Sequence, residues 1–343
     1  MTTARRLLAG IDGLPYGARQ RELATTARTL PPPKLTGLLD ELYAEGGFAR
    51  RIGLQLAYVA GERGYAERCL AAGETGVVRR ALGVAVRLGL PASVLTARLP
   101  ELPSALRATL YQDVRRRRAT GLAEALLPAV RERFGDVEAA VLLPACSPAT
   151  VAAALPELGY AVTGWRMVGH RHPAVFLDHL DAELSATPRS GWAQVLETLG
   201  TGLAAAALSE PGRVLAVLER AAPHASVPFG LARTIGLLAR HDPARLLRVL
   251  LDPHRPGGVP GGRTLWRALL GASDDELVAF GRALGAHRLV RFLRVVPPSR
   301  RAGVYAGVVG RRDLTLSEVP IAALDELPAA ARAAEAERLL TLR

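Results

Sequence analysis

A short motif that begins with proline recurs four times between residues 148 and 250, with successive copies 25 to 38 residues apart. In each copy the proline is followed by alanine or glycine, then by an apolar residue at the third position and by leucine at the seventh. Proline fits the first turn of a helix, and positions three and seven lie on one helical face, so each copy predicts a helix start. The copies begin at Pro148, Pro173, Pro211 and Pro243. Recurrence at this period predicts an all-α fold, an irregular α-solenoid of stacked antiparallel helix pairs.

A second repeat has seven identities at a constant offset of 194 residues. It reads Pro-x3-Arg-Ala-x2-Tyr-x2-Val-x2-Arg-Arg and starts at Pro103 and at Pro297. Its first part returns at Pro328, and more faintly at Pro15. Tyrosine, valine and alanine in this spacing share one helical face, so these segments are also predicted to be helices with a buried stripe.

Other helix signals fill the rest of the chain. Apolar periodicity predicts two helices in residues 14–43 and further helices in residues 48–71 and 77–90. The last two begin near basic pairs, Arg50-Arg51 and Arg79-Arg80, and Ser273–Glu276 is a capping box.

Residues 253–262, rich in proline and glycine, predict a loop or hinge. We therefore expect an N-terminal helical-repeat stack over 1–252 and C-terminal helical repeats over 263–343. The segment that starts at Pro328 has no polar outer face of the kind a terminal repeat needs, so we expect the natural protein to continue.

Composition agrees with close helix packing, and the charged residues are unevenly distributed along the chain. Hydrophobic residues make up 49% of the chain but aromatic residues only 5%, which disfavours a β-sandwich. Lys34 is the only lysine and asparagine is absent, as in a high-GC genome such as that of an actinomycete, so the preference for arginine over lysine carries little functional weight. The net charge is +12, and residues 1–120 hold 19 basic against 10 acidic side chains, so the positive field is mostly N-terminal.

Two widely spaced cysteines, Cys69 and Cys146, lie in apolar helical surroundings and predict buried, reduced thiols rather than a disulfide. We find neither a signal peptide nor an 18-residue apolar run. These features predict a cytoplasmic protein without a membrane span.

Helix pairs of 30 to 40 residues, with arginine in an apolar first helix and proline at the second, resemble HEAT repeats. The stretch Arg79-Arg80-Ala81-Leu82-x4-Arg87-Leu88 is similar to the short bacterial type. The resemblance implies an α-solenoid with a concave binding surface, used for scaffolding or partner binding, with a few DNA glycosylases among its members. No catalytic motif of those members matches this chain, so only the fold and the class of role carry over.

Two groups of arginines are candidate binding residues. The first is a basic patch that suits nucleic acid or an acidic protein surface; its alternative is a solvated helix end. Its members are Arg79, Arg80, Arg107, Arg115, Arg116, Arg117 and Arg118. The second is an arginine ladder on the polar side of two proline-started helices, predicted to line a concave face; its alternative is an exposed face of scattered charges that includes Glu219 and Asp242. Its members are Arg213, Arg220, Arg245 and Arg248.

No catalytic, metal or cofactor site is predicted. His170, His172 and His179 have no zinc-binding spacing, and we expect structural or surface roles for them. The chain has no nucleophile elbow and no phosphate loop, and the absence of asparagine excludes a Cys-His-Asn triad. The tryptophans have apolar neighbours at helical spacing and predict core packing; they are Trp165, Trp192 and Trp266.

Two functions from different classes remain open. The first is a non-enzymatic scaffold that binds a protein partner or another region of its own longer chain. The second is a nucleic-acid-binding solenoid, with or without glycosylase-like chemistry. A nucleic-acid binder is expected to gather arginines along one continuous strip, whereas a scaffold is expected to show apolar patches there. An enzyme with a carboxylate in the groove is a weaker third possibility.

Overall fold

The computed structural model describes residues 2–226, 231, 234–250, 272–283, 289, 292–293, 296–308, 329, 332–333 and 336–337. Within these ranges every regular element is a helix and no strand occurs, which confirms the predicted all-α helical-repeat fold. The chain divides into two compact units, Met1–Thr163 and Gly164–Arg343. The predicted loop at 253–262, Trp266, and Pro328 with most of the segment that it starts lie outside the described residues.

Unit 1 consists of short helices of 5 to 15 residues joined by tight turns. They are α1 (Thr3–Ile11), α2 (Tyr16–Thr29), α3 (Pro32–Glu45), α4 (Gly47–Ala60), α5 (Arg63–Leu70), α6 (Thr75–Leu88), α7 (Ala92–Arg98), α8 (Ser104–Arg117), α9 (Thr120–Phe134), α10 (Asp136–Ala140) and α11 (Pro148–Leu158). The helices expected in residues 14–43, 48–71 and 77–90 are all present.

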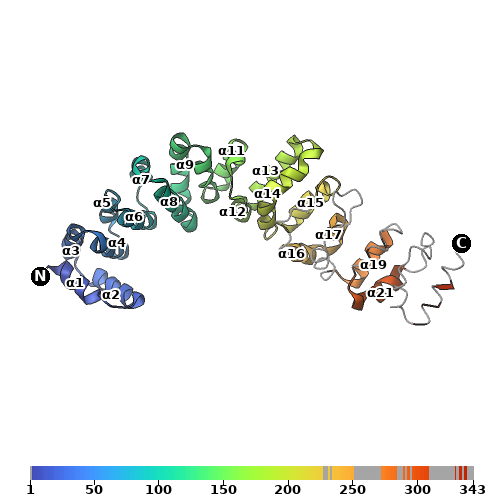
Figure 1. The fold of residues 1–343 in the computed structure, drawn as a ribbon, viewed down its shortest axis with the longest axis horizontal. Coiled ribbons are helices and arrows are strands. Elements are labelled where there is room, and N and C mark those ends of the chain that lie inside the picture. The colour runs from blue at the N-terminus through green and yellow to red at the C-terminus, as the bar shows by residue number, and fades with distance from the viewer. Residues whose placement is uncertain are drawn as a thin grey trace. The chain divides into compact units, whose positions relative to one another are not determined.

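The long helices of unit 1 stack as a row. The row consists of α2, α4, α6 and α8, and each of these helices packs against the next. A second set of helices packs on the row: α3 contacts α4, α5 contacts α6, and α9 contacts α8. Figure 1 shows α3, α5, α7 and α9 along the upper edge of the unit and the row of α2, α4, α6 and α8 below them. A solenoid of this kind presents the same side of each row helix on one continuous surface.

Unit 2 by itself is also built of short helices that pack on their neighbours. Its described helices are α12 (Trp165–Arg171), α13 (Pro173–Ala186), α14 (Trp192–Ala206), α15 (Pro211–Ala221), α16 (Ile235–His241), α17 (Pro243–Leu250), α19 (Asp274–Ala283) and α21 (Pro298–Val308). The helices α12 and α14 approach closely at Gly169 and Gly202, where a Cβ on Gly169 would lie 2.2 Å from the Gly202 carbonyl oxygen. The predicted capping box is present at the start of α19, where Ser273 and Glu276 exchange hydrogen bonds.

The aromatic core of unit 2 confirms two of the tryptophan predictions. Trp165 and Trp192 are both buried. His179 stacks on Trp165 with 5.4 Å between the ring centroids, and burial lowers the pKa of its imidazole. This packing is a structural role for His179.

All four predicted proline-started helices begin at their proline, as α11, α13, α15 and α17. The residues at the third and seventh positions after each proline are buried, so the predicted apolar stripe is confirmed. These residues are Val151, Leu155, Phe176, Leu180, Val214, Leu218, Leu246 and Leu250.

The second repeat also has a common structure. In three copies the arginine four residues after the proline donates a hydrogen bond to the carbonyl of the residue before that proline. The pairs are Arg19 with Leu14 at 3.2 Å, Arg107 with Leu102 at 2.8 Å, and Arg301 with Val296 at 3.2 Å. The repeated tyrosines, Tyr111 and Tyr305, are both fully buried.

Cys69 and Cys146 are free and buried, as predicted. Burial raises the pKa of the Cys69 thiol to about 11 and that of the Cys146 thiol to about 12. None of the helices in the described ranges has the length and hydropathy needed to cross a bilayer.

Candidate functional site: an arginine-lined face on unit 1

Two open depressions lie on the row of helices α2, α4, α6 and α8. The larger measures about 400 Å³ and is lined by residues of α4, α6 and α8. Its lining is Arg51, Gly76, Arg79, Arg80, Gly83, Val84, Arg87, Thr109 and Asp113. Arginine is the commonest residue in this lining, and Asp113 is the single acidic one.

The second depression measures about 160 Å³ and lies over α2 and α4. Its lining is Tyr16, Arg19, Gln20, Leu23, Phe48, Arg51, Ile52, Gln55 and Arg80. Arg51 and Arg80 line both depressions, so the two form one continuous surface. We call this surface the arginine face and define it by Arg51, Arg79, Arg80 and Arg87.

Helical spacing explains why these side chains meet. On α4, Phe48, Arg51, Gln55 and Tyr58 follow one another at intervals of three or four residues, so they share one side of the helix. On α6, Gly76, Arg80, Gly83 and Arg87 do the same. The opposite side of each helix is apolar and buried, and it holds these two stripes outward.

The glycines of α6 hollow the surface between the arginines. Gly76 has open space where a Cβ would stand, and a Cβ on Gly83 would lie 3.0 Å from Oδ2 of Asp113. The absence of a side chain at Gly83 therefore lets Asp113 of α8 approach α6.

The arginines of this face form no ion pair within the part of unit 1 that the structure describes. Among residues 2–163, no carboxylate oxygen lies within 4.0 Å of Arg51, Arg79, Arg80 or Arg87. Arg80 donates instead to the Gln55 side chain at 3.1 Å. The guanidinium of Arg51 lies 5.7 Å from the ring centroid of Phe48, and that of Arg87 lies 5.4 Å from the ring centroid of Tyr58.

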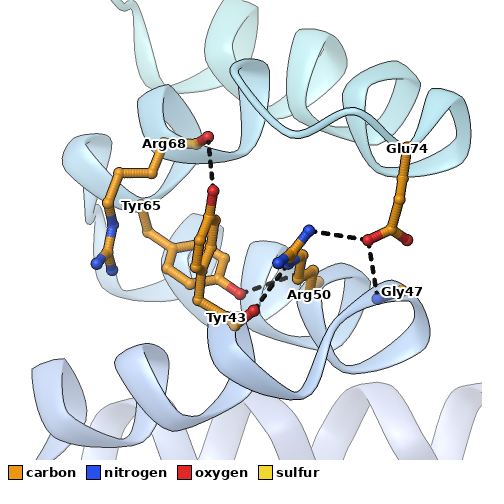
Figure 2. A network of polar contacts seen from close by, with 6 residues as sticks. All are labelled: Tyr43, Gly47, Arg50, Tyr65, Arg68 and Glu74. Carbon is orange, nitrogen blue, oxygen red and sulfur yellow. Dashed lines mark hydrogen bonds and ion pairs between the residues drawn. The ribbon is translucent and has the colours of Figure 1, made fainter.

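Some other arginines of unit 1 are engaged in structural contacts, among them Arg50, Arg68 and Arg107, and Figure 2 shows the contacts of Arg50. Arg50 donates to the Tyr43 carbonyl at 2.7 Å and pairs with Glu74 at 2.8 Å. Its guanidinium lies 4.4 Å from the Tyr43 ring centroid, and its carbonyl accepts from the Tyr65 hydroxyl. Arg50 therefore ties α3, α4 and the start of α6 together, while its neighbour Arg51 lines the arginine face.

Arg107, predicted as part of the basic patch, does not lie on this face. Its side chain is only 13% exposed and forms a two-pronged ion pair with Glu138, at 2.6 and 2.9 Å. The guanidinium also lies 3.8 Å from the ring centroid of Phe134. Hydrogen bonds from Arg107 and from Tyr111 lower the pKa of the Glu138 carboxyl. These contacts give Arg107 a structural role between α8, α9 and α10.

The run from Arg115 to Arg118 ends helix α8. Arg115 is half-buried, and burial lowers the pKa of its guanidinium. Arg118 is the helix C-cap in a left-handed conformation, with φ of 53°. Arg116 and Arg117 are exposed in the last turn, where positive charge is favourable to the helix dipole.

The predicted ladder arginines lie together on α15 and α17, and each has a carboxylate partner. Arg213 pairs with Asp178 at 2.7 Å, and Arg220 with Asp181 at 2.5 Å. Glu219 pairs with Arg245 at 2.7 Å and with Arg248 at 3.5 Å. The acids that neutralise this surface come from α13 and α15.

Sequence reasoning selected Arg79 and Arg80 but missed Arg51, Arg87 and the aromatic residues beside them. A signal for them exists in the sequence. Residues 47–60 and 75–88, which form α4 and α6, contain arginines but no aspartate or glutamate. Two neighbouring basic helices without an acidic residue leave a charge that only other elements could neutralise.

No protein-family model, no curated protein and no solved structure matches the sequence.

Proposed function

We propose that this chain is a non-enzymatic, HEAT-like helical-repeat protein that binds nucleic acid through the arginine face of unit 1. The observation that carries the proposal is a continuous strip of four exposed arginines that have no carboxylate partner among residues 2–163. Guanidinium groups bind phosphates in two-pronged fashion, and clustered positive charge attracts a polyanion from solution. Two free thiols support a cytoplasmic location, and the composition supports an origin in a high-GC, actinomycete-like genome.

A scaffold function for a protein partner has a separate observation in its favour. Tyr160 is 80% exposed, and its hydroxyl donates a hydrogen bond to Asp136 of α10, next to the exposed Val137. An open depression of about 530 Å³, lined by residues that include Leu127 and Leu158, lies over α9 and α11. An exposed tyrosine near apolar side chains is a typical protein-binding anchor. This surface is the second candidate site, and it is distinct from the arginine face.

The nucleic-acid proposal is tested by binding at two salt concentrations. If the four arginines each neutralise one phosphate, the slope of log affinity against log salt is about −3. Affinity then falls roughly 50-fold between 50 and 200 mM salt. The absence of binding at 50 mM salt to both DNA and RNA would overturn the proposal.

Charge reversal separates the arginine face from the general positive charge. The double variant Arg79→Glu/Arg87→Glu is expected to lose binding at 100 mM salt. The control Arg21→Glu/Arg133→Glu makes the same change in net charge at exposed arginines that line neither depression. Equal losses in the two variants would mean that net charge, and not the arginine face, attracts the nucleic acid.

A further inference from the structure

We propose that the arginine face binds single-stranded rather than duplex nucleic acid, with bases stacked on Phe48 and Tyr16 and phosphates held by Arg51, Arg79 and Arg80. This inference rests on the proposed function and names its ligand. The arrangement behind it is an aromatic pair that lies in the same depression as two of the arginines.

Two aromatic side chains are exposed in the depression over α2 and α4. Tyr16, at the first position of α2, is 71% exposed, and Phe48, near the start of α4, is 50% exposed. Both belong to the same lining as Arg51 and Arg80. A single exposed aromatic residue is ordinary on a protein surface, but two in one basic depression form a stacking platform.

The stripe on α4 has an aromatic residue at each end, and each ring has a guanidinium beside it. Phe48 is followed by Arg51, and Tyr58 at the far end of the same stripe has the guanidinium of Arg87 beside it. A single strand has phosphates and bases in regular alternation, so it complements such a stripe. Base stacking on aromatic rings and phosphate pairing with arginines then occur together.

A duplex does not use the aromatic residues in this way. Its bases are stacked on one another, so the faces that would meet Phe48 and Tyr16 are covered. Arginines alone would be sufficient for a duplex, because its phosphates are the accessible groups. An acidic peptide would supply carboxylates but no aromatic faces of comparable area.

The test measures the affinity of a labelled oligothymidine, an oligouridine and a duplex of equal length, by fluorescence anisotropy at one salt concentration. We expect at least one of the single strands to bind about ten times more tightly than the duplex. Phe48→Leu keeps an apolar side chain but removes the ring, so it is expected to weaken single-strand binding about tenfold. The salt slope is expected to stay unchanged because no charge is lost. Phe48→Tyr is expected to retain affinity.

Tyr160→Leu is the matched control, since it removes an exposed aromatic ring outside the arginine face. Equal affinity for duplex and single strands, with no effect of Phe48→Leu, would overturn this inference and leave the proposed function standing. The inference would also be overturned if polyglutamate bound as tightly as the oligothymidine and Phe48→Leu changed the affinity for neither ligand. The absence of binding to any nucleic acid would overturn the proposed function itself.

Discussion

Arg50 and Arg51 are neighbours in α4, yet within residues 2–163 only Arg50 has a carboxylate partner. Arg50 pairs with Glu74 at 2.8 Å and packs on Tyr43, whereas Arg51 lines both depressions of the arginine face. One basic pair is therefore divided between a contact that joins helices and a surface that carries free positive charge. Elsewhere in the chain, paired arginines are expected to contribute to stability and arginines without a carboxylate partner to binding.

Removal of carboxylates in unit 2 is expected to create a second anion-binding surface. Asp178→Asn combined with Asp181→Asn leaves Arg213 and Arg220 without their present ion-pair partners. Because exposed ion pairs stabilise little, the free energy of unfolding is expected to change by less than about 1 kcal/mol. When these changes are combined with Arg79→Glu/Arg87→Glu, salt-dependent nucleic-acid binding is expected to reappear, with a slope of up to roughly −1.4 for two phosphate contacts. The absence of binding in that combination would contradict this.

Arg107 is expected to matter for stability and Arg79 for binding. Arg107→Met leaves the Glu138 carboxylate without its two-pronged partner and is expected to lower the free energy of unfolding by about 2 kcal/mol. Arg79→Met, at an exposed position, is expected to change it by less than about 0.5 kcal/mol. Chemical denaturation measures the free energy of unfolding of both variants. A similar decrease in the two would contradict the assigned roles.

The close approach of α12 and α14 is expected to tolerate no side chain at Gly202. A Cβ there would lie 2.5 Å from the ring of Phe176 and 3.0 Å from the carbonyl oxygen of Trp165. Gly202→Ala is therefore expected to destabilise unit 2 by about 1 to 3 kcal/mol. Gly236→Ala is the control, because nothing lies within 4 Å of its added Cβ. A lower thermal midpoint of unfolding for Gly236→Ala than for Gly202→Ala would refute the packing argument.

Acid is expected to weaken the junction between α9 and α11 through Glu124. Hydrogen bonds from Ser147 and Thr150 lower the pKa of this carboxyl from 4.5 to about 2. Since the folded pKa is the lower one, the contribution to stability is complete above pH 4.5 and is lost as the pH falls toward 2.

Thermal midpoints measured across this pH range check the prediction. Wild type is expected to exceed Glu124→Gln at neutral pH, and the difference is expected to close by about pH 2. Glu132→Gln, at an exposed position of the same helix, provides the control. A difference between wild type and Glu124→Gln that stays constant down to pH 2 would contradict the assignment.

The helices and their buried stripes are predictable from the amino-acid sequence alone. Proline at the first turn and apolar residues at fixed intervals are local signals, and they are sufficient to assign Val214 and Leu218 to the core, where both are buried. The repeated tyrosines, Tyr111 and Tyr305, follow from the same kind of signal.

The roles of individual arginines could not be predicted in this way, because periodicity describes only one helix. Whether Arg213 is free depends on Asp178, which precedes it by 35 residues and belongs to another helix. Arg107 likewise meets Glu138 from 31 residues away. A helical face can be predicted from its own sequence, but the carboxylates that neutralise it come from the neighbouring helices.

The hydrogen bond from arginine to the residue before proline has a consequence for how such an array can grow. Donor and acceptor are five residues apart in each of the three copies, at Arg19, Arg107 and Arg301. A duplicated or inserted segment therefore brings its own helix start with it and needs no compensating change in distant parts of the chain. Closing so short a loop also costs little conformational entropy, so these helix starts can form early in folding, before the helices stack.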